Sequence, residues 1–191
     1  PKLGTLLQPG RSRVGRLIAV EIGFPPVPAQ GFGAAAATPA WAAETWPKRE
    51  PDAHKNSVGA LLLVAGRPGM AGAAVMAARA ALRSGVGLLR VVSSSENRSI
   101  IQESVPEAIF VPAEDVDAVH EAAAASQAMG VGPGLGNGAE AGELLAAVLE
   151  VSEGLPTVLD ADALNLAASG EGPGVAEWAA DRPVLVTPHL G

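Results

Sequence analysis

The stretch Gln127-Ala-Met-Gly-Val-Gly-Pro-Gly-Leu-Gly-Asn-Gly-Ala139 passes from a short apolar segment, through five alternating glycines, into a helical pattern over 139–151. Glycine loses much backbone entropy on folding, so a dense run indicates that a ligand or another chain segment must approach the main chain closely. A strand that ends in a glycine loop and opens a helix presents free N–H groups and a positive dipole end to an anion. The Gly130–Gly138 loop is therefore a candidate phosphate site, although a flexible surface loop would have a similar composition.

Strands and helical patterns alternate on both sides of this loop. The apolar run Ala60–Ala65 is typical of a strand buried on both faces, and a helical pattern follows it over 71–83. The repeat of roughly 25–30 residues is the size of a βαβ unit. We therefore expect an α/β fold with a mostly parallel sheet that helices cover on both faces. Further strands are predicted at 87–92, 108–111, 127–131, 157–160 and 183–187, an exposed helix or loop at 96–103, and helices at 116–125, 139–151 and 161–168.

The first 51 residues differ in composition from the rest. Residues 16–24 predict a β-strand, and the prolines and glycines of residues 25–51 indicate a linker. Within it, Thr38 and Pro39 predict the start of a short helix, with Thr38 as the N-cap. The sequence begins at Pro1 and stops at Gly191 directly after a predicted strand, so we expect a piece of a longer protein that is truncated at its C-terminus.

Composition excludes several classes of protein. Asp and Glu number 20 against 13 Lys and Arg, and the net charge of −7 argues against a nucleic-acid partner, which needs a basic surface. The chain has no cysteine, which excludes disulfides and Cys-ligated metals. No apolar stretch reaches the roughly 18 residues of a membrane span, and no secretory signal is visible. We therefore expect a cytoplasmic protein without a membrane partner.

The candidate site residues follow the predicted strands. Ligands of α/β sheets bind beyond the carboxyl ends of the strands, where the Gly66–Gly72 loop, the Gly130–Gly138 loop, Asp160 and His189 all fall. Asp160 is the favoured carboxylate, because Asp162 begins a predicted helix and is interpreted as its N-cap. His189 can hydrogen-bond a ligand or move a proton, or it can be a solvated loop histidine. Tight packing of a helix against the sheet would also explain the first of the two loops.

Several familiar chemistries do not fit. No Gly-Lys-Ser/Thr follows the first glycine loop, so it is not a Walker loop. The third glycine of a dinucleotide fingerprint would fall at Leu135 or Asn137, which leaves a Rossmann dehydrogenase a less favoured alternative. His54 and His120 have no partners at metal-ligand spacing. Ser93–Ser95 lacks the context of a nucleophile elbow, so acyl transfer is not expected.

The ordered motifs resemble a known family, the ADP/ATP-dependent NAD(P)H-hydrate dehydratases, over about residues 48–191. Residues 15–25 are similar to the last strand of the NAD(P)H-hydrate epimerase domain, which often precedes the dehydratase in one bifunctional chain. The resemblance thus implies an epimerase tail at 1–24, a linker at 25–47 and the N-terminal part of the dehydratase domain at 48–191. The motifs are Asp52-Ala-His-Lys55, Gly59-Ala-Leu-Leu-Leu-Val-Ala-Gly66, Gly69-Met-Ala-Gly72-Ala-Ala, Ala80-Ala-Leu-Arg-Ser-Gly-Val-Gly-Leu88, Val105-Pro-Glu107, Gly130-Val-Gly-Pro-Gly-Leu-Gly136, Val158-Leu-Asp-Ala-Asp-Ala-Leu-Asn-Leu166 and Val186-Thr-Pro-His189.

The resemblance implies a ribokinase-like fold and the repair of hydrated NADH or NADPH (NADHX or NADPHX), with ADP or ATP and Mg²⁺. Substrate contacts of the family carry over to Ala73, Gly134 and His189, and Asp160 joins them by the strand-end argument. The catalytic base and the adenine-nucleotide segment of the family are expected beyond Gly191. No catalytic residue, nucleotide contact or metal ligand is therefore assigned within the chain, and we expect residues 1–191 alone to be inactive.

Two departures from the family pattern leave other functions open. The family usually has Lys-Gly at Lys55-Asn56, and Thr-Pro-His-Pro-Gly-Glu where this chain has Thr187-Pro-His-Leu-Gly191. The alternatives are a ribokinase-like small-molecule kinase and a non-catalytic nucleotide-binding module, which fold alone does not separate. We also expect poor solubility or a homo-oligomer, because a truncated sheet exposes an unpaired edge.

Overall fold

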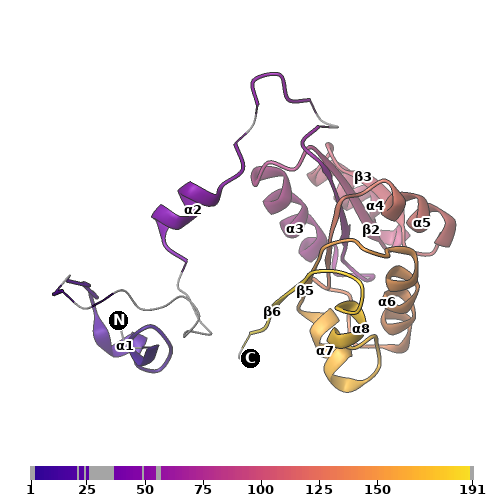
Figure 1. Cartoon of the computed structure of the whole chain (residues 1–191). Coiled ribbons are helices and arrows are strands. Elements are labelled where there is room, and N and C mark those ends of the chain that lie inside the picture. Colours follow the sequence, from indigo (N-terminus) through magenta and orange to yellow (C-terminus); the bar gives the residue numbers. More distant parts are fainter. Residues whose placement is uncertain are drawn as a thin grey trace. The chain divides into compact units, whose positions relative to one another are not determined.

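The computed structural model describes residues 3–20, 22–23, 25, 37–48, 50–54 and 57–189. The chain divides into two compact units, Pro1–Lys48 and Arg49–Gly191 (Figure 1). The departure from the family pattern at Lys55-Asn56 lies outside the described residues. Leu190 and Gly191 also lie outside them.

The described part of the second unit contains one six-stranded sheet. All of its pairings are parallel, and the strand order is β3-β2-β1-β4-β5-β6. The order reverses between β1 and β4, which is the topological switch point of a doubly wound sheet. The predicted α/β fold with a mostly parallel sheet is confirmed. The strands are β1 (Ala60–Val64), β2 (Leu88–Ser93), β3 (Ile109–Pro112), β4 (Ala128–Val131), β5 (Thr157–Asp160) and β6 (Val184–Thr187).

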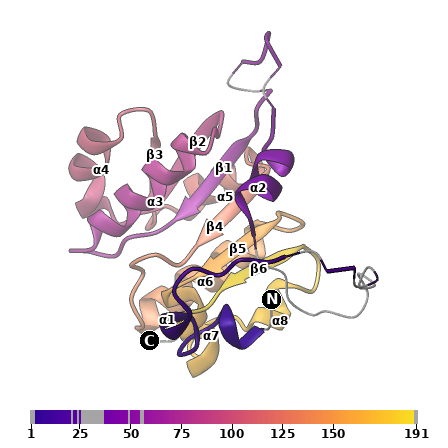
Figure 2. The ribbon, with the colours of Figure 1, turned by 90° about the vertical axis from the view of Figure 1, so that its left-hand side faces the viewer.

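Helices pack on both sides of this sheet (Figure 1 and Figure 2). On one side, α3 (Ala71–Arg83) and α4 (Arg98–Ser104) cover β1, β2 and β3. On the other side lie α5 (Val116–Ala124), α6 (Ala139–Val151), α7 (Asp162–Ser169) and α8 (Val175–Trp178). The buried residues of α6, Ala141, Gly142, Leu145 and Val148, recur at helical spacing, so one apolar stripe faces the sheet. No described helix is long and apolar enough to cross a membrane.

Helices flank both faces of the sheet as predicted, but the described helices leave one face of β5 and β6 exposed. Val158 and Leu185 are paired neighbours in these strands and are 38% and 61% exposed. They lie on the same face as Leu63, which α3 covers at the other half of the sheet. The cause is the winding of the chain, because the described helices that connect β4, β5 and β6 all pack on the opposite face.

The prediction of a short helix in the first unit is confirmed. Helix α2 spans Pro39–Thr45, and the Thr38 side chain accepts a hydrogen bond of 3.2 Å from the backbone N–H of Trp41. This bond satisfies one of the N–H groups that lack a partner inside the first turn, as an N-cap should.

The prediction of a strand at 16–24 is wrong for its described residues. Residues 16–20 and 22–23 form no strand, and they follow the short helices η1 (Leu3–Thr5) and α1 (Arg11–Val14). A strand needs a neighbouring strand in a sheet, and residues 16–20 are paired with no strand in the described part of the chain. Ile18 and Val20 are correspondingly 66% and 72% exposed. The assignment of 1–24 to an epimerase domain stays a prediction.

Candidate functional site

The four sequence-predicted site segments lie at the carboxyl ends of neighbouring strands. The Gly66–Gly72 loop follows β1, the Gly130–Gly138 loop follows β4, Asp160 ends β5, and His189 lies two residues beyond β6. Because these strands are parallel and adjacent in the order β1-β4-β5-β6, their carboxyl ends meet at one edge of the sheet. The two glycine loops flank the switch point, where ligands of such sheets bind.

The two glycine loops are hydrogen-bonded to each other across the switch point. The backbone N–H of Gly66 donates to the carbonyl of Pro133 (2.9 Å), and that of Arg67 donates to the carbonyl of Gly134 (2.7 Å). Gly134 has φ +67, and a Cβ added to it would lie 2.7 Å from the Cβ of Ala73. Both the backbone angle and the close approach to Ala73 require glycine here. The structure therefore brings Ala73 and Gly134, two of the predicted substrate contacts, side by side.

Asp160 and His189 occupy the next two strand ends. Asp160 is partly exposed and pairs in register with Thr187, two residues before the exposed His189. The Asp160 carbonyl packs so closely on Gly132 that a Cβ at Gly132 would overlap it. No hydrogen bond joins the side chain of Asp160 or His189 to another described residue. Both side chains are thus available to a ligand, but neither is recorded in contact with the Ala73–Gly134 pair.

Asp162 is not the N-cap of α7, contrary to the sequence prediction. The N-cap is Ala161, with the unusual φ of 47 for a residue other than glycine, and Asp162 is the first residue of the helix. The Asp162 carboxylate instead accepts a hydrogen bond of 2.7 Å from the backbone N–H of Gly136 and one of 3.2 Å from Asn165. The carboxylate therefore ties the start of α7 to the Gly130–Gly138 loop.

Removing this tie should loosen the glycine loop without unfolding the sheet. We expect Asp162→Ala to lower the free energy of unfolding by about 1 kcal/mol, because one charge-assisted hydrogen bond is lost at a partly exposed site. Hydrogen exchange followed by NMR should show about fivefold faster exchange at the Gly136 amide. Asp162→Asn keeps an acceptor oxygen and should restore most of the protection. Unchanged Gly136 exchange in Asp162→Ala would contradict this role.

The buried side chains of Ser93 and Asn97 hydrogen-bond to the backbone of the Gly66–Gly72 loop. Both side chains are 2% exposed. The Asn97 amide donates to the carbonyls of Gly66 and Arg67 and to Ser93 Oγ, each at 3.0 Å, and Ser93 Oγ donates to Gly66 at 2.8 Å. Buried polar side chains persist when their hydrogen bonds are made, and here those bonds fix two consecutive loop carbonyls.

Sequence reasoning missed this support. Residues 96–103 were expected to form an exposed helix or loop, but Asn97 and Ile101 are buried there. The available signal was the change from apolar residues to Ser93 at the carboxyl end of a buried strand, the same position in which the other site residues were recognised.

The outer end of the same edge, beside β3, carries a negative charge. Glu114 accepts hydrogen bonds from the backbone N–H and the hydroxyl of Ser95, at 3.1 and 2.9 Å. Burial raises the pKa of Glu114, but hydrogen bonds to the carboxylate lower this pKa by more. The pKa of Glu114 therefore lies below its ordinary value. The carboxylate is ionised at neutral pH, which disfavours an anionic ligand at this end of the edge.

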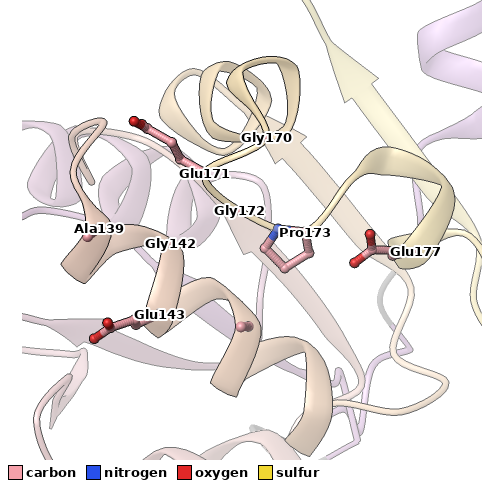
Figure 3. A pocket seen from close by; sticks show the side chains of 9 residues that line it. Ala139, Gly142, Glu143, Gly170, Glu171, Gly172, Pro173 and Glu177 are labelled. Atoms are coloured by element: carbon pink, nitrogen blue, oxygen red, sulfur yellow. The ribbon is translucent and has the colours of Figure 1, made fainter.

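A cavity of about 520 Å³ lies between α6 and the segment that joins α7 to α8 (Figure 3). Gly170, Gly172 and Pro173 run beside α6 there, and the glutamates at 143, 171 and 177 line the cavity. Three carboxylates of like charge repel a phosphate-bearing ligand. None of the sequence-predicted site residues lines this cavity, so we do not place the candidate site in it.

Solved structures of similar fold define the class of protein. A ribokinase-like superfamily protein from Enterococcus faecalis superposes with a TM-score of 0.69 and 27% identity, over 76% of this chain and 50% of that one. The ADP/ATP-dependent NAD(P)H-hydrate dehydratase from Bacillus subtilis, co-crystallised with ATP and Mg²⁺, has a TM-score of 0.60 and 31% identity, over 80% and 52%. The fold is ribokinase-like, as the sequence resemblance implied.

The family itself is shown by the sequence. The chain belongs to the NAD(P)H-hydrate dehydratase family, because the Carb_kinase model of that description matches residues 61–191. An ADP-dependent (S)-NAD(P)H-hydrate dehydratase from Listeria monocytogenes is 38% identical over 146 residues, 76% of this chain and 51% of that protein. A bifunctional NAD(P)H-hydrate repair enzyme from Moorella thermoacetica is 34% identical along 100% of this chain, which spans 38% of it. The chain thus spans about half or less of these relatives.

Proposed function

We propose that the protein acts in the nucleotide-dependent dehydration of hydrated NAD(P)H back to NAD(P)H. The observation that carries this proposal is the contact of Ala73 with Gly134 at the switch point, in a chain of the dehydratase family. Two residues that the family resemblance assigns to substrate meet where a doubly wound sheet binds its ligand. Substrate and activity come from the relatives, whose names describe dehydratases of this kind.

In this proposal the glycine loops, Asp160 and His189 bind and orient the hydrated dinucleotide. Gly134 and Ala73 form a surface without long side chains, which lets the ligand approach the backbone. Asp160 and His189 lie at the next strand ends and offer an acceptor and a titratable imidazole to the polar groups of the ligand.

ADP or ATP with Mg²⁺ remains part of the proposal through the relatives. When bound, the nucleotide supplies the phosphoryl group that converts the added hydroxyl of the nicotinamide ring into a leaving group. Within the described ranges, no group of three His, Asp or Glu side chains is placed to hold a metal ion. We therefore assign neither Mg²⁺ nor the nucleotide to described residues and derive no step through them.

The arrangement of domains is likewise a proposal. Residues 1–24 would belong to an epimerase domain and 25–47 to a linker, and the dehydratase part would begin at 48. The alignment of the whole chain with a bifunctional repair enzyme supports this arrangement. A cytoplasmic location and a homo-oligomer complete the proposal, since hydrated nicotinamide cofactors arise where NADH and NADPH are used.

Recovery of NADH absorbance from purified NADHX tests the function. We expect the whole protein to restore the absorbance only when ADP or ATP with Mg²⁺ is added, and the chain 1–191 alone to be inactive. NADPHX in a parallel assay measures the preference between the two cofactors. A folded whole protein that restores no absorbance with either nucleotide would refute the dehydratase proposal. Stable accumulation of a phosphorylated alcohol from another substrate would favour a small-molecule kinase.

A further inference from the structure

Arg67 lies in the Gly66–Gly72 loop and extends over the other glycine loop. A Cβ added to Gly136 would lie 2.6 Å from Cδ and 3.0 Å from Nε of Arg67. The backbone N–H of Arg67 is itself bonded to the carbonyl of Gly134. Both the main chain and the aliphatic part of Arg67 are therefore held against the Gly130–Gly138 loop, which places the guanidinium at the switch point.

Apart from one long hydrogen bond, the donors of the Arg67 guanidinium have no partner among the described residues. The Arg67 side chain is exposed. Within the described residues, its guanidinium donates one long hydrogen bond, of 3.5 Å, to the Pro68 carbonyl. Arg79, Arg90 and Arg182, by contrast, donate to backbone carbonyls at 3.1, 3.0 and 2.6 Å. The ion pair recorded in the described part of the chain joins Arg182 to Asp181, not Arg67 to an acid.

No ion pair joins the Arg67 guanidinium to a carboxylate within the described residues. Asp162, the acid tied to Gly136, is the neighbouring carboxylate, and its two oxygens already accept from Gly136 and Asn165. Glu114, which follows β3, is a further carboxylate beyond the strand ends. In a chain of net charge −7, Arg67 is thus a cation at the two glycine loops, beside a carboxylate that is already hydrogen-bonded.

We propose that the Arg67 guanidinium binds a phosphate group of the ligand that occupies the two glycine loops. A guanidinium presents a planar fork of donors that matches phosphate oxygens, and the lack of a side chain at Gly136 lets Arg67 lie against the loop that it would serve. This inference rests on the proposed function for its ligands. The phosphate belongs either to the diphosphate of the hydrated dinucleotide or to the ADP or ATP, and the experiment separates the two.

The experiment compares wild type with Arg67→Gln, Arg67→Lys and the control Arg83→Gln in the whole protein. Arg83 is an exposed arginine at the last turn of α3, the opposite end from the glycine loop, so its loss removes equal charge away from the site. The measurements are KM and kcat for NADHX and for ADP, and calorimetric binding of inorganic pyrophosphate. Pyrophosphate binding needs no turnover, so it tests Arg67 even where the dehydratase proposal fails.

We expect Arg67→Gln to raise one KM about tenfold with little change in kcat, and to weaken pyrophosphate binding by a similar factor. Which KM rises identifies whether dinucleotide or nucleotide supplies the phosphate. Arg67→Lys should recover part of the affinity, and Arg83→Gln should resemble wild type. Unchanged KM values and unchanged pyrophosphate binding in Arg67→Gln would overturn the inference, as would an equal effect of Arg83→Gln.

Discussion

Substituting Gly132 with alanine should lower the free energy of unfolding by about 3 kcal/mol or more. Gly132 has φ +128, which residues with a Cβ rarely adopt, and backbone strain of this kind amounts to about 1–3 kcal/mol. The new Cβ would also overlap the Asp160 carbonyl oxygen and lie 3.0 Å from the Ala163 Cβ. Overpacking adds about 1–3 kcal/mol. Since domains of this size are stable by about 5–15 kcal/mol, a large share of the stability would be lost.

The expected damage extends to the candidate site. The Asp160 main chain must move away from β4 to accommodate the methyl group, and Asp162 follows in the same turn. The 2.7 Å bond from Gly136 to the Asp162 carboxylate should then weaken. Urea denaturation followed by circular dichroism measures the stability, and hydrogen exchange at the Gly136 amide reports on the loop.

Gly138→Ala is the matched control in the same glycine run. Gly138 has an ordinary φ of −99, and a Cβ there would meet no atom within 4 Å. Its substitution should change the stability by about 0.5 kcal/mol or less. If Gly132→Ala were as stable as Gly138→Ala, the close approach of β5 to Gly132 would be wrong.

The order of elements was largely predictable from the sequence. The apolar run of β1 and the periodic stripe of α3 are local signals, and both elements were predicted within a residue or two of their bounds. The shared edge of the site was predictable too, because parallel strands separated by helices place their carboxyl ends together. The Thr38 cap followed from residue type and from the proline after it.

Features that depend on distant residues were not predictable. Asp162 resembled an N-cap because it begins a helix, but its partner is the Gly136 N–H, 26 positions earlier. Asn97 looked like a surface residue because its acceptors, the carbonyls of Gly66 and Arg67, lie about 30 positions away. The strand predicted at 16–24 failed for a related reason, because local β propensity does not provide a neighbour.

One aromatic residue, Trp178 of α8, anchors the segment before β6 in the core. Trp178 is fully buried in the core cluster beneath α6, and Arg182 lies with its guanidinium 5.5 Å from the centre of the Trp178 ring. That guanidinium donates to the carbonyls of Ser152 (2.6 Å) and Leu149 (3.4 Å) at the C-terminus of α6, a helix with no basic residue in its last turn. A cation at this position stabilises the negative end of the helix dipole. Trp178 therefore supports both the packing of α8 and the capping of α6.

Trp178→Ala should accordingly lower the free energy of unfolding by about 3–5 kcal/mol, the range for deleting a buried aromatic side chain. Loss of the ring also frees Arg182, so the last turn of α6 should exchange its amides faster than the first. Urea denaturation followed by circular dichroism measures the effect, with Trp41→Ala as the control because Trp41 is 56% exposed on α2. The control should change the stability by about 0.5 kcal/mol or less. Because Trp178 precedes β6 by a few residues, β6 and His189 beyond it should lose order first. A Trp178→Ala protein as stable as the control would show that the core does not depend on the Trp178 side chain.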